Sequence, residues 1–189
     1  MFNMKHIFIY SLLLICLFAS CNSSNSPGTE NVSNIEKTIT RPFSDSLKSD
    51  TFKVKLDVNS SKETKLIFTI TSFEGNLVYE EAIKADDLFK NYDATIDLKK
   101  KKNQAKFLNE ELDRFFDEEN FMEPAIMENE VPDQYVPDKG FYEELKKSQL
   151  NGFIYRLGKE NKMYIGWSAK DKKVKTYYNC CKITSQAKK

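Results

Sequence analysis

The chain has 189 residues, with 29 Lys and Arg side chains, 28 Asp and Glu side chains and a single histidine. Residues 1–20 contain only one charged side chain, Lys5, so loss of this segment would leave 28 basic and 28 acidic side chains. Such a neutral balance argues against a nucleic-acid partner, which requires a basic excess on one face. The one histidine, His6, lies in the same segment, and without it the chain cannot support Ser-His-Asp, Cys-His or His-ligated zinc chemistry.

Residues 1–21 have the pattern of a secretory signal. Basic Lys5 precedes an apolar run over residues 7–18, which ends in the tripeptide Ala19-Ser20-Cys21. A charged start, an apolar stretch and small residues before a cleavage site are typical of such a signal. A membrane-spanning helix would need ~20 apolar residues, and this run is shorter.

The end of this segment resembles the lipobox of bacterial lipoproteins, with Phe18 where that family usually carries an aliphatic residue. The resemblance implies that the chain is cut just before Cys21 and that a lipid, including palmitate, is attached to the Cys21 thiol. It also implies a place in the cell envelope, anchored to a membrane. Because no acidic run follows Cys21, we expect the periplasmic side of the outer membrane. The resemblance implies no biochemical activity.

Residues 21–50 predict a flexible tether that carries the lipidated cysteine. Asn, Ser and Thr dominate this segment, together with Pro27 and Gly28, and large apolar residues are few. Such a segment cannot bury enough surface to offset the entropy lost on ordering. We therefore expect a single globular domain over residues 51–182 and a polar tail over residues 183–189.

Three strands are predicted at the start of the domain. Apolar and polar residues alternate over 51–58, which is typical of a strand with one buried face. The segments 64–72 and 77–83 predict two more strands, with turns between them at 59–62 and 74–76. Together they predict an antiparallel meander.

The middle of the domain predicts mainly helix. A short helical segment is expected over residues 84–92 and a short strand over 94–98. The clearest helix has apolar residues at three- and four-residue steps, namely Ala105, Leu108, Leu112, Phe115 and Phe116. It should fray at the carboxylates of residues 117–119, which oppose the helix macrodipole.

A second meander is predicted near the C-terminus. Its strands cover residues 153–157, 163–168 and 173–181, and a helix over 141–149 precedes them. The fold class is therefore α+β: an antiparallel sheet built from two meanders, with two or three helices packed on one face.

Residues 120–140 form a long segment that three prolines exclude from a continuous helix. It is acidic yet contains apolar side chains, which are hard to bury beside solvated carboxylates. Met127, Val131 and Tyr135 are therefore candidate anchors for a partner. The alternative is that they fold back as a lid over the core. Tyr164 is a further binding candidate, because nearby Gly166 leaves room for a ligand to approach the sheet.

Cys180 and Cys181 are candidates for thiol or metal chemistry. The pattern lacks a CxxC spacing and a histidine co-ligand, so a packed structural cysteine beside an exposed one is the competing interpretation, and a vicinal disulfide is another. The sequence predicts no catalytic residue, no metal site and no cofactor.

The composition and patterns favour a lipid-anchored cell-envelope protein with a non-catalytic binding or scaffolding role. Its expected partners are the membrane, through the lipid, and an envelope protein or glycan. The alternative is a histidine-free, glycosidase-like hydrolase that uses paired carboxylates from residues 110–138. Two inward carboxylates in a concave pocket would favour the hydrolase, and an exposed apolar or aromatic patch would favour the binding protein.

Overall fold

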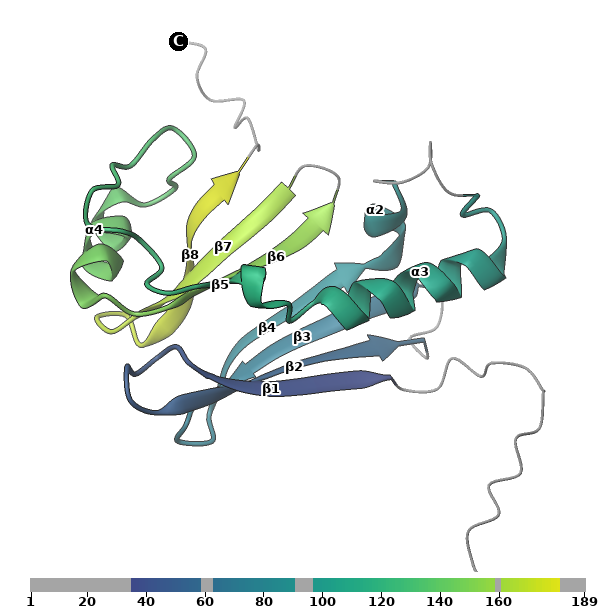
Figure 1. Ribbon diagram of the computed structural model, residues 1–189, viewed down its shortest axis with the longest axis horizontal. Helices are drawn as coiled ribbons and strands as arrows, with labels where there is room; N and C mark the ends of the chain where they lie inside the picture. Colours follow the sequence, from purple (N-terminus) through teal and green to yellow (C-terminus); the bar gives the residue numbers. More distant parts are fainter. Residues whose placement is uncertain (1–34, 59–62, 91–96, 159–160, 181–189) are drawn as a thin grey trace, which may run out of the picture. The chain divides into compact units, whose positions relative to one another are not determined.

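The structure is a computed structural model that describes residues 35–58, 63–90, 97–158 and 161–180. Its strands form two four-stranded antiparallel sheets, ordered β1-β2-β3-β4 and β5-β6-β7-β8 (Figure 1). Three helices accompany them. The predicted α+β class with two antiparallel meanders is confirmed, and each meander gains a fourth strand and forms a sheet of its own.

The elements follow the chain in a simple order. The first sheet contains β1 (Glu36–Pro42), β2 (Ser49–Asp57), β3 (Lys65–Thr71) and β4 (Leu77–Lys84). The middle contains α2 (Ala85–Phe89), α3 (Lys101–Arg114) and the 3-10 turn η2 (Glu118–Asn120). The second sheet contains β5 (Phe121–Met122), β6 (Gly152–Gly158), β7 (Asn161–Ser168) and β8 (Lys173–Cys180), with α4 (Lys139–Ser148) between β5 and β6.

Strand β1 corrects the predicted tether, which extended to residue 50. β1 pairs with β2 along its whole length, from Glu36 opposite Lys55 to Pro42 opposite Ser49. Its Lys37 also lies 2.9 Å from a carboxylate oxygen of Asp113 in α3. An edge strand obtains hydrogen bonds from its neighbour and needs few apolar side chains, so composition alone did not reveal it. The remainder of the predicted tether, the signal segment and the predicted polar tail lie outside the described residues.

The first core lies between the two sheets. Alternate residues of β2 and β3 are buried there, namely Phe52, Val54, Leu56, Leu66, Phe68 and Ile70. The rings of Phe52 and Phe68 lie 5.4 and 5.3 Å from the ring of Phe153 in β6. The period-two pattern of the sequence therefore predicts correctly which side chains of β2 and β3 face the core.

Helix α3 closes this core and ends slightly earlier than the sequence predicted, because Phe115 and Phe116 lie in the turn that follows it. Leu112 is fully buried, and Phe115 packs 5.1 Å from Phe68, ring to ring. The helix stops at Arg114, before the acidic residues 117–119. Asp97 and Leu98, the described end of the strand predicted over 94–98, are not in a strand.

A second, smaller core lies on the opposite face of the second sheet. Tyr164 and Ile165 are consecutive in β7, yet Tyr164 packs in this cluster while Ile165 packs in the first. Helix α4 covers this face, and Leu145 sits so close to β7 that a Cβ on Gly166 would lie 2.5 Å from it. The Asp138 side chain accepts a hydrogen bond from the Phe141 N–H and caps α4.

Candidate functional site

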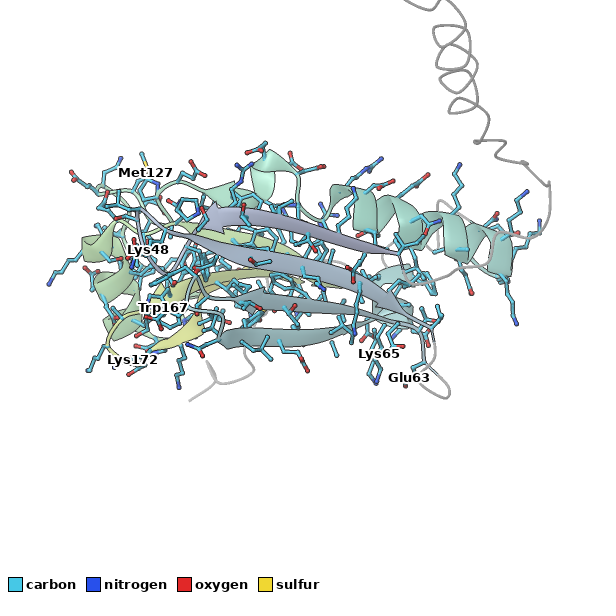
Figure 2. The ribbon with its side chains drawn as sticks, turned by 90° about the horizontal axis from the view of Figure 1, so that it is seen from below. Lys48, Glu63, Lys65, Met127, Trp167 and Lys172 are labelled. Carbon is cyan, nitrogen blue, oxygen red and sulfur yellow. The ribbon has the colours of Figure 1, made fainter. Side chains whose placement is uncertain are left out.

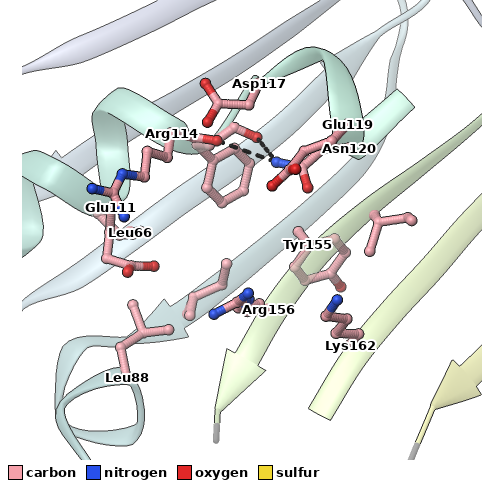
Figure 3. Close-up of a pocket in the computed structure, with 13 residues that line it drawn as sticks. Leu66, Leu88, Glu111, Arg114, Asp117, Glu119, Asn120, Tyr155, Arg156 and Lys162 are labelled. Carbon is pink, nitrogen blue, oxygen red and sulfur yellow. Dashed lines mark hydrogen bonds between the residues drawn. The ribbon is translucent and has the colours of Figure 1, made fainter. Parts of the chain in front are cut away.

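A cavity of about 290 Å³ lies beside the C-terminal end of α3 and the strands β6 and β7 (Figure 3). Leu66, Ile83 and Leu88, from β3, β4 and α2, supply an apolar floor. These three side chains belong to the first core and are almost completely buried. The cavity therefore opens from the edge of the core and not from a surface loop.

The charged side chains of the cavity are divided between two walls. Glu111 and Arg114 of α3, with Asp117 and Glu119 after it, form the helix wall. Arg156 of β6 and Lys162 of β7 form the strand wall. The helix wall thus carries three carboxylates and one guanidinium, whereas the strand wall carries two cations. Figure 3 shows these groups on either side of the cavity.

Asn120 fixes the helix wall. Its Nδ2 donates hydrogen bonds of 3.2 Å to the carbonyl oxygens of Arg114 and Phe115. Carbonyls in the last turn of a helix have no partner within the helix, and this side chain supplies one. The turn after α3 is therefore held in place, and with it the residues of the helix wall.

Glu111 is the carboxylate most affected by this environment. Burial raises the pKa of Glu111, and the positive charges of Arg156 and Arg114 oppose that shift. The favourable charge interaction with Arg156 links the helix wall to the strand wall. Glu111 is also half-buried in the helix wall, whereas Asp117 and Glu119 are exposed.

Tyr155 also lines the cavity and is anchored below it. Its hydroxyl oxygen lies 2.5 Å from the hydroxyl oxygen of Tyr79 in β4, across the two sheets. Burial raises the pKa of Tyr79 to about 12 and also raises the pKa of Tyr155. Both hydroxyls are therefore neutral at physiological pH and hold β4 and β6 at a fixed spacing.

The structure separates the four predicted binding residues into two pairs. Met127 and Val131 have exposed fractions of 52% and 81% and protrude from the segment between β5 and α4. Tyr135 and Tyr164 are half-buried, and their rings lie 6.0 and 5.1 Å from the ring of Tyr178. The two tyrosines pack against the protein itself, and the room beside Gly166 is filled by Leu145.

The segment between β5 and α4 covers the second core and also exposes apolar groups. Ala125, Ile126 and Val136 are buried in that core. The Asn179 N–H donates a hydrogen bond of 3.1 Å to the Tyr135 carbonyl oxygen, which ties the segment to β8. The segment is therefore a structural cover, from which Met127 and Val131 protrude.

The structure places one of the two predicted thiols, that of Cys180, in a disulfide. Cys180 is disulfide-bonded, so its sulfur is not a thiol or a metal ligand in this structure. Cys181 and the lipidation candidate Cys21 lie outside the described residues. Where side chains are described, no group of three or more Cys, Asp or Glu residues could hold a metal ion.

The sequence singled out residues 110–138, the stretch that contains the carboxylates of the helix wall, and gave no indication of the strand wall or of the cavity. Glu111, Asp117 and Glu119 belong to the acidic stretch that the sequence singled out. Arg156 was missed, although a charged residue inside the apolar run of β6 is a signal that could have found it. Lys162 carries no such signal, because only the fold brings it beside α3.

Within the four described ranges, no helix has both the length and the apolar character needed to cross a bilayer. Comparison of the chain with models of known families, with characterised proteins and with solved structures finds no match.

Proposed function

We propose that this chain is a lipid-anchored cell-envelope protein with a non-catalytic binding role, and that its ligand occupies the cavity beside α3 and β6. The cavity is the observation that supports the proposed binding role. It gathers six charged side chains on two walls above an apolar floor, and polar groups that converge in one concave space are what fixes the orientation of a bound small molecule. The anchoring half is supported by the lipobox-like residues before Cys21.

The cavity volume limits the size of the ligand. Sites for drug-sized molecules occupy ~300–1,000 Å³, and the volume here, about 290 Å³, lies at the lower limit. A single small metabolite of up to dipeptide size fits this space, whereas a longer peptide or an oligosaccharide chain would extend beyond it. We therefore expect a ligand of metabolite size.

A specific observation also favours a second candidate, the histidine-free hydrolase. Glu111 has a raised pKa and shares the cavity with Asp117 and Glu119, and a carboxylic acid beside a carboxylate is the arrangement of many glycosidases. The cations on both walls favour the binding role, because Arg156 and Arg114 stabilise the ionised form of Glu111, whereas a general acid must be protonated before it can act. Ligand turnover would distinguish the two candidates.

The anchoring half is tested by acyl labelling. A Cys21→Ser variant should lose palmitate incorporation and should leave the membrane fraction. If the variant is still labelled, or if the unaltered protein takes up no label, the anchoring proposal is wrong.

The binding half is tested by thermal-shift screening of the full chain in detergent against amino acids, sugars, nucleotides and organic acids. At least one class should raise the melting temperature, and the compound should be recovered intact. Arg156→Glu should abolish the shift, while Lys173→Glu on exposed β8 should preserve it. Absence of any shift, or an equal shift in Arg156→Glu, would overturn the cavity as the binding site. Recovery of a cleaved compound would favour the hydrolase.

A further inference from the structure

We propose that the cavity beside α3 and β6 binds a small zwitterion with an aliphatic side group, such as a free amino acid or a dipeptide. This inference rests on the proposed binding function and adds the chemical class of the ligand. Three observations carry it: the opposite charges of the two walls, the apolar floor and the small volume.

The charge division of the cavity matches a molecule with both a cationic and an anionic end. Arg156 and Lys162 on the strand wall suit a carboxylate, and Arg can grip a carboxylate with two parallel hydrogen bonds. Glu111 and Glu119 on the helix wall suit an ammonium group. A purely anionic ligand would meet the helix wall with the wrong charge, and a purely cationic ligand would meet the strand wall in the same way.

The floor of the cavity matches an aliphatic side group. Leu66, Ile83 and Leu88 are 1–2% exposed in the structure and offer no side-chain hydrogen-bonding group. A sugar would place hydroxyls against this floor and lose their hydrogen bonds to water without replacement. An aliphatic side group makes no such demand on the floor, because it has no polar atom that would lose a partner there.

The rigidity of the walls favours selection by charge. Asn120 caps α3 with two hydrogen bonds, and the Tyr79–Tyr155 hydroxyl pair joins the sheets beneath the cavity. These bonds fix the backbone that carries the charged side chains, so the division of charge between the two walls is kept when a ligand binds. If the ligand lacks one of the two charges, the unmatched wall would then be desolvated without compensation, which is how polar sites discriminate between close analogues.

The test uses calorimetric titration of the full chain in detergent with leucine, alanyl-leucine, N-acetylleucine and leucinamide. N-acetylleucine lacks the cationic group of leucine, and leucinamide lacks its anionic group. We expect leucine or alanyl-leucine to bind, and each blocked analogue to bind at least about tenfold more weakly, which corresponds to ~1.4 kcal/mol.

Two double variants test which charged group of the ligand each wall binds. Arg156→Gln with Lys162→Gln should weaken leucine binding and remove the difference between leucine and leucinamide, because the carboxylate no longer has a partner. Glu111→Gln with Glu119→Gln should remove the difference between leucine and N-acetylleucine. The matched control, Lys53→Gln with Glu36→Gln, changes an exposed ion pair between β2 and β1 that does not line the cavity and should bind like the unaltered protein.

Equal or tighter binding of N-acetylleucine or leucinamide would overturn the zwitterion assignment, as would unchanged affinity in both wall variants. Absence of binding by all four probes to a chain that melts cooperatively would overturn it as well. In each case the proposed binding function survives if another compound class gives a thermal shift that depends on Arg156. A failure of the zwitterion assignment can therefore be distinguished from a failure of the proposed binding function.

Discussion

The buried carboxylate of Asp50 accepts a hydrogen bond of 2.8 Å from the Phe73 N–H and so joins the β1–β2 loop to the β3–β4 turn. Asp50 is completely buried, and it also accepts hydrogen bonds from the Ser44 N–H at 2.6 Å and the Ser44 hydroxyl at 3.0 Å. The joined loops present apolar side chains to solvent, namely Leu47 from the first and Phe73 from the second. Figure 2 shows Lys48, from the first loop, toward the same end of the sheets as Met127 and opposite Glu63 and Lys65.

Asp50→Asn should destabilise the protein. The amide has only one acceptor oxygen, so its NH₂ group must face an N–H that the carboxylate accepts in the native structure. Loss of a hydrogen bond to a charged group, with a buried donor left unsatisfied, costs ~1.5–3 kcal/mol. Urea unfolding measures this change. Glu74→Gln, on the exposed tip of the same turn, should leave the midpoint unchanged, and equal midpoints for both variants would contradict the role of Asp50.

Leu112→Ala should lower the free energy of unfolding by ~2–5 kcal/mol. The side chain is fully buried at the centre of the first core, and truncation would leave a cavity under α3. Leu77→Ala is the matched control, because Leu77 is 60% exposed and should contribute little. A melting temperature for Leu112→Ala equal to that of the control would show that α3 does not pack as described.

Ile126→Ala and Met127→Ala test the cover over the second core. The residues are neighbours, but Ile126 is 1% exposed and Met127 is 52% exposed. Ile126→Ala should cost ~2–5 kcal/mol of stability, whereas Met127→Ala should change it by less than ~0.5 kcal/mol. Chemical denaturation measures both. Similar losses in the two variants would contradict the orientation of the segment between β5 and α4.

Gly152→Ala should destabilise the junction of β6 with the same cover. A Cβ at this position would lie 2.8 Å from the Tyr177 hydroxyl and 2.9 Å from the Ala125 Cβ. The Tyr177 hydroxyl donates to the Ala125 carbonyl oxygen at 3.1 Å, so relief of the clash strains that hydrogen bond. Overpacking of this kind costs ~1–3 kcal/mol. In Gly158→Ala the nearest atom is 3.7 Å away, and this variant should melt near the unaltered protein.

The Tyr79–Tyr155 pair predicts loss of stability at high pH. Because the pKa of Tyr79 is raised to about 12 in the folded protein, the unfolded chain ionises first, near pH ~10. The unfolded state then binds fewer protons than the folded state, and stability falls as pH rises from ~10 to 12. Tyr79→Phe should show a smaller loss between pH 8 and 11 in urea titrations. An identical pH dependence in Tyr79→Phe would show that this pair does not couple to folding.

The sequence by itself determined the α+β class and most of the elements, because these depend on short-range periodicity. Alternation over residues 51–58 identified β2 within two residues at its start, and apolar spacing placed Leu112 on the buried face of α3. The acidic residues 117–119 indicated the end of that helix only approximately, since it stops at Arg114, before Phe115 and Phe116. Each of these signals is local, since a strand or helix buries one face wherever its partner comes from.

Only the tertiary structure decided how the meanders combine and where the cavity lies. β1 depends on hydrogen bonds from β2, and its own composition is that of a polar segment. Glu111 and Arg156 lie 45 positions apart in the printed sequence, and they line one cavity because α3 and β6 pack on the same core. Side chains that are distant along the chain are brought together by burial of the elements that carry them, and no local pattern records that pairing.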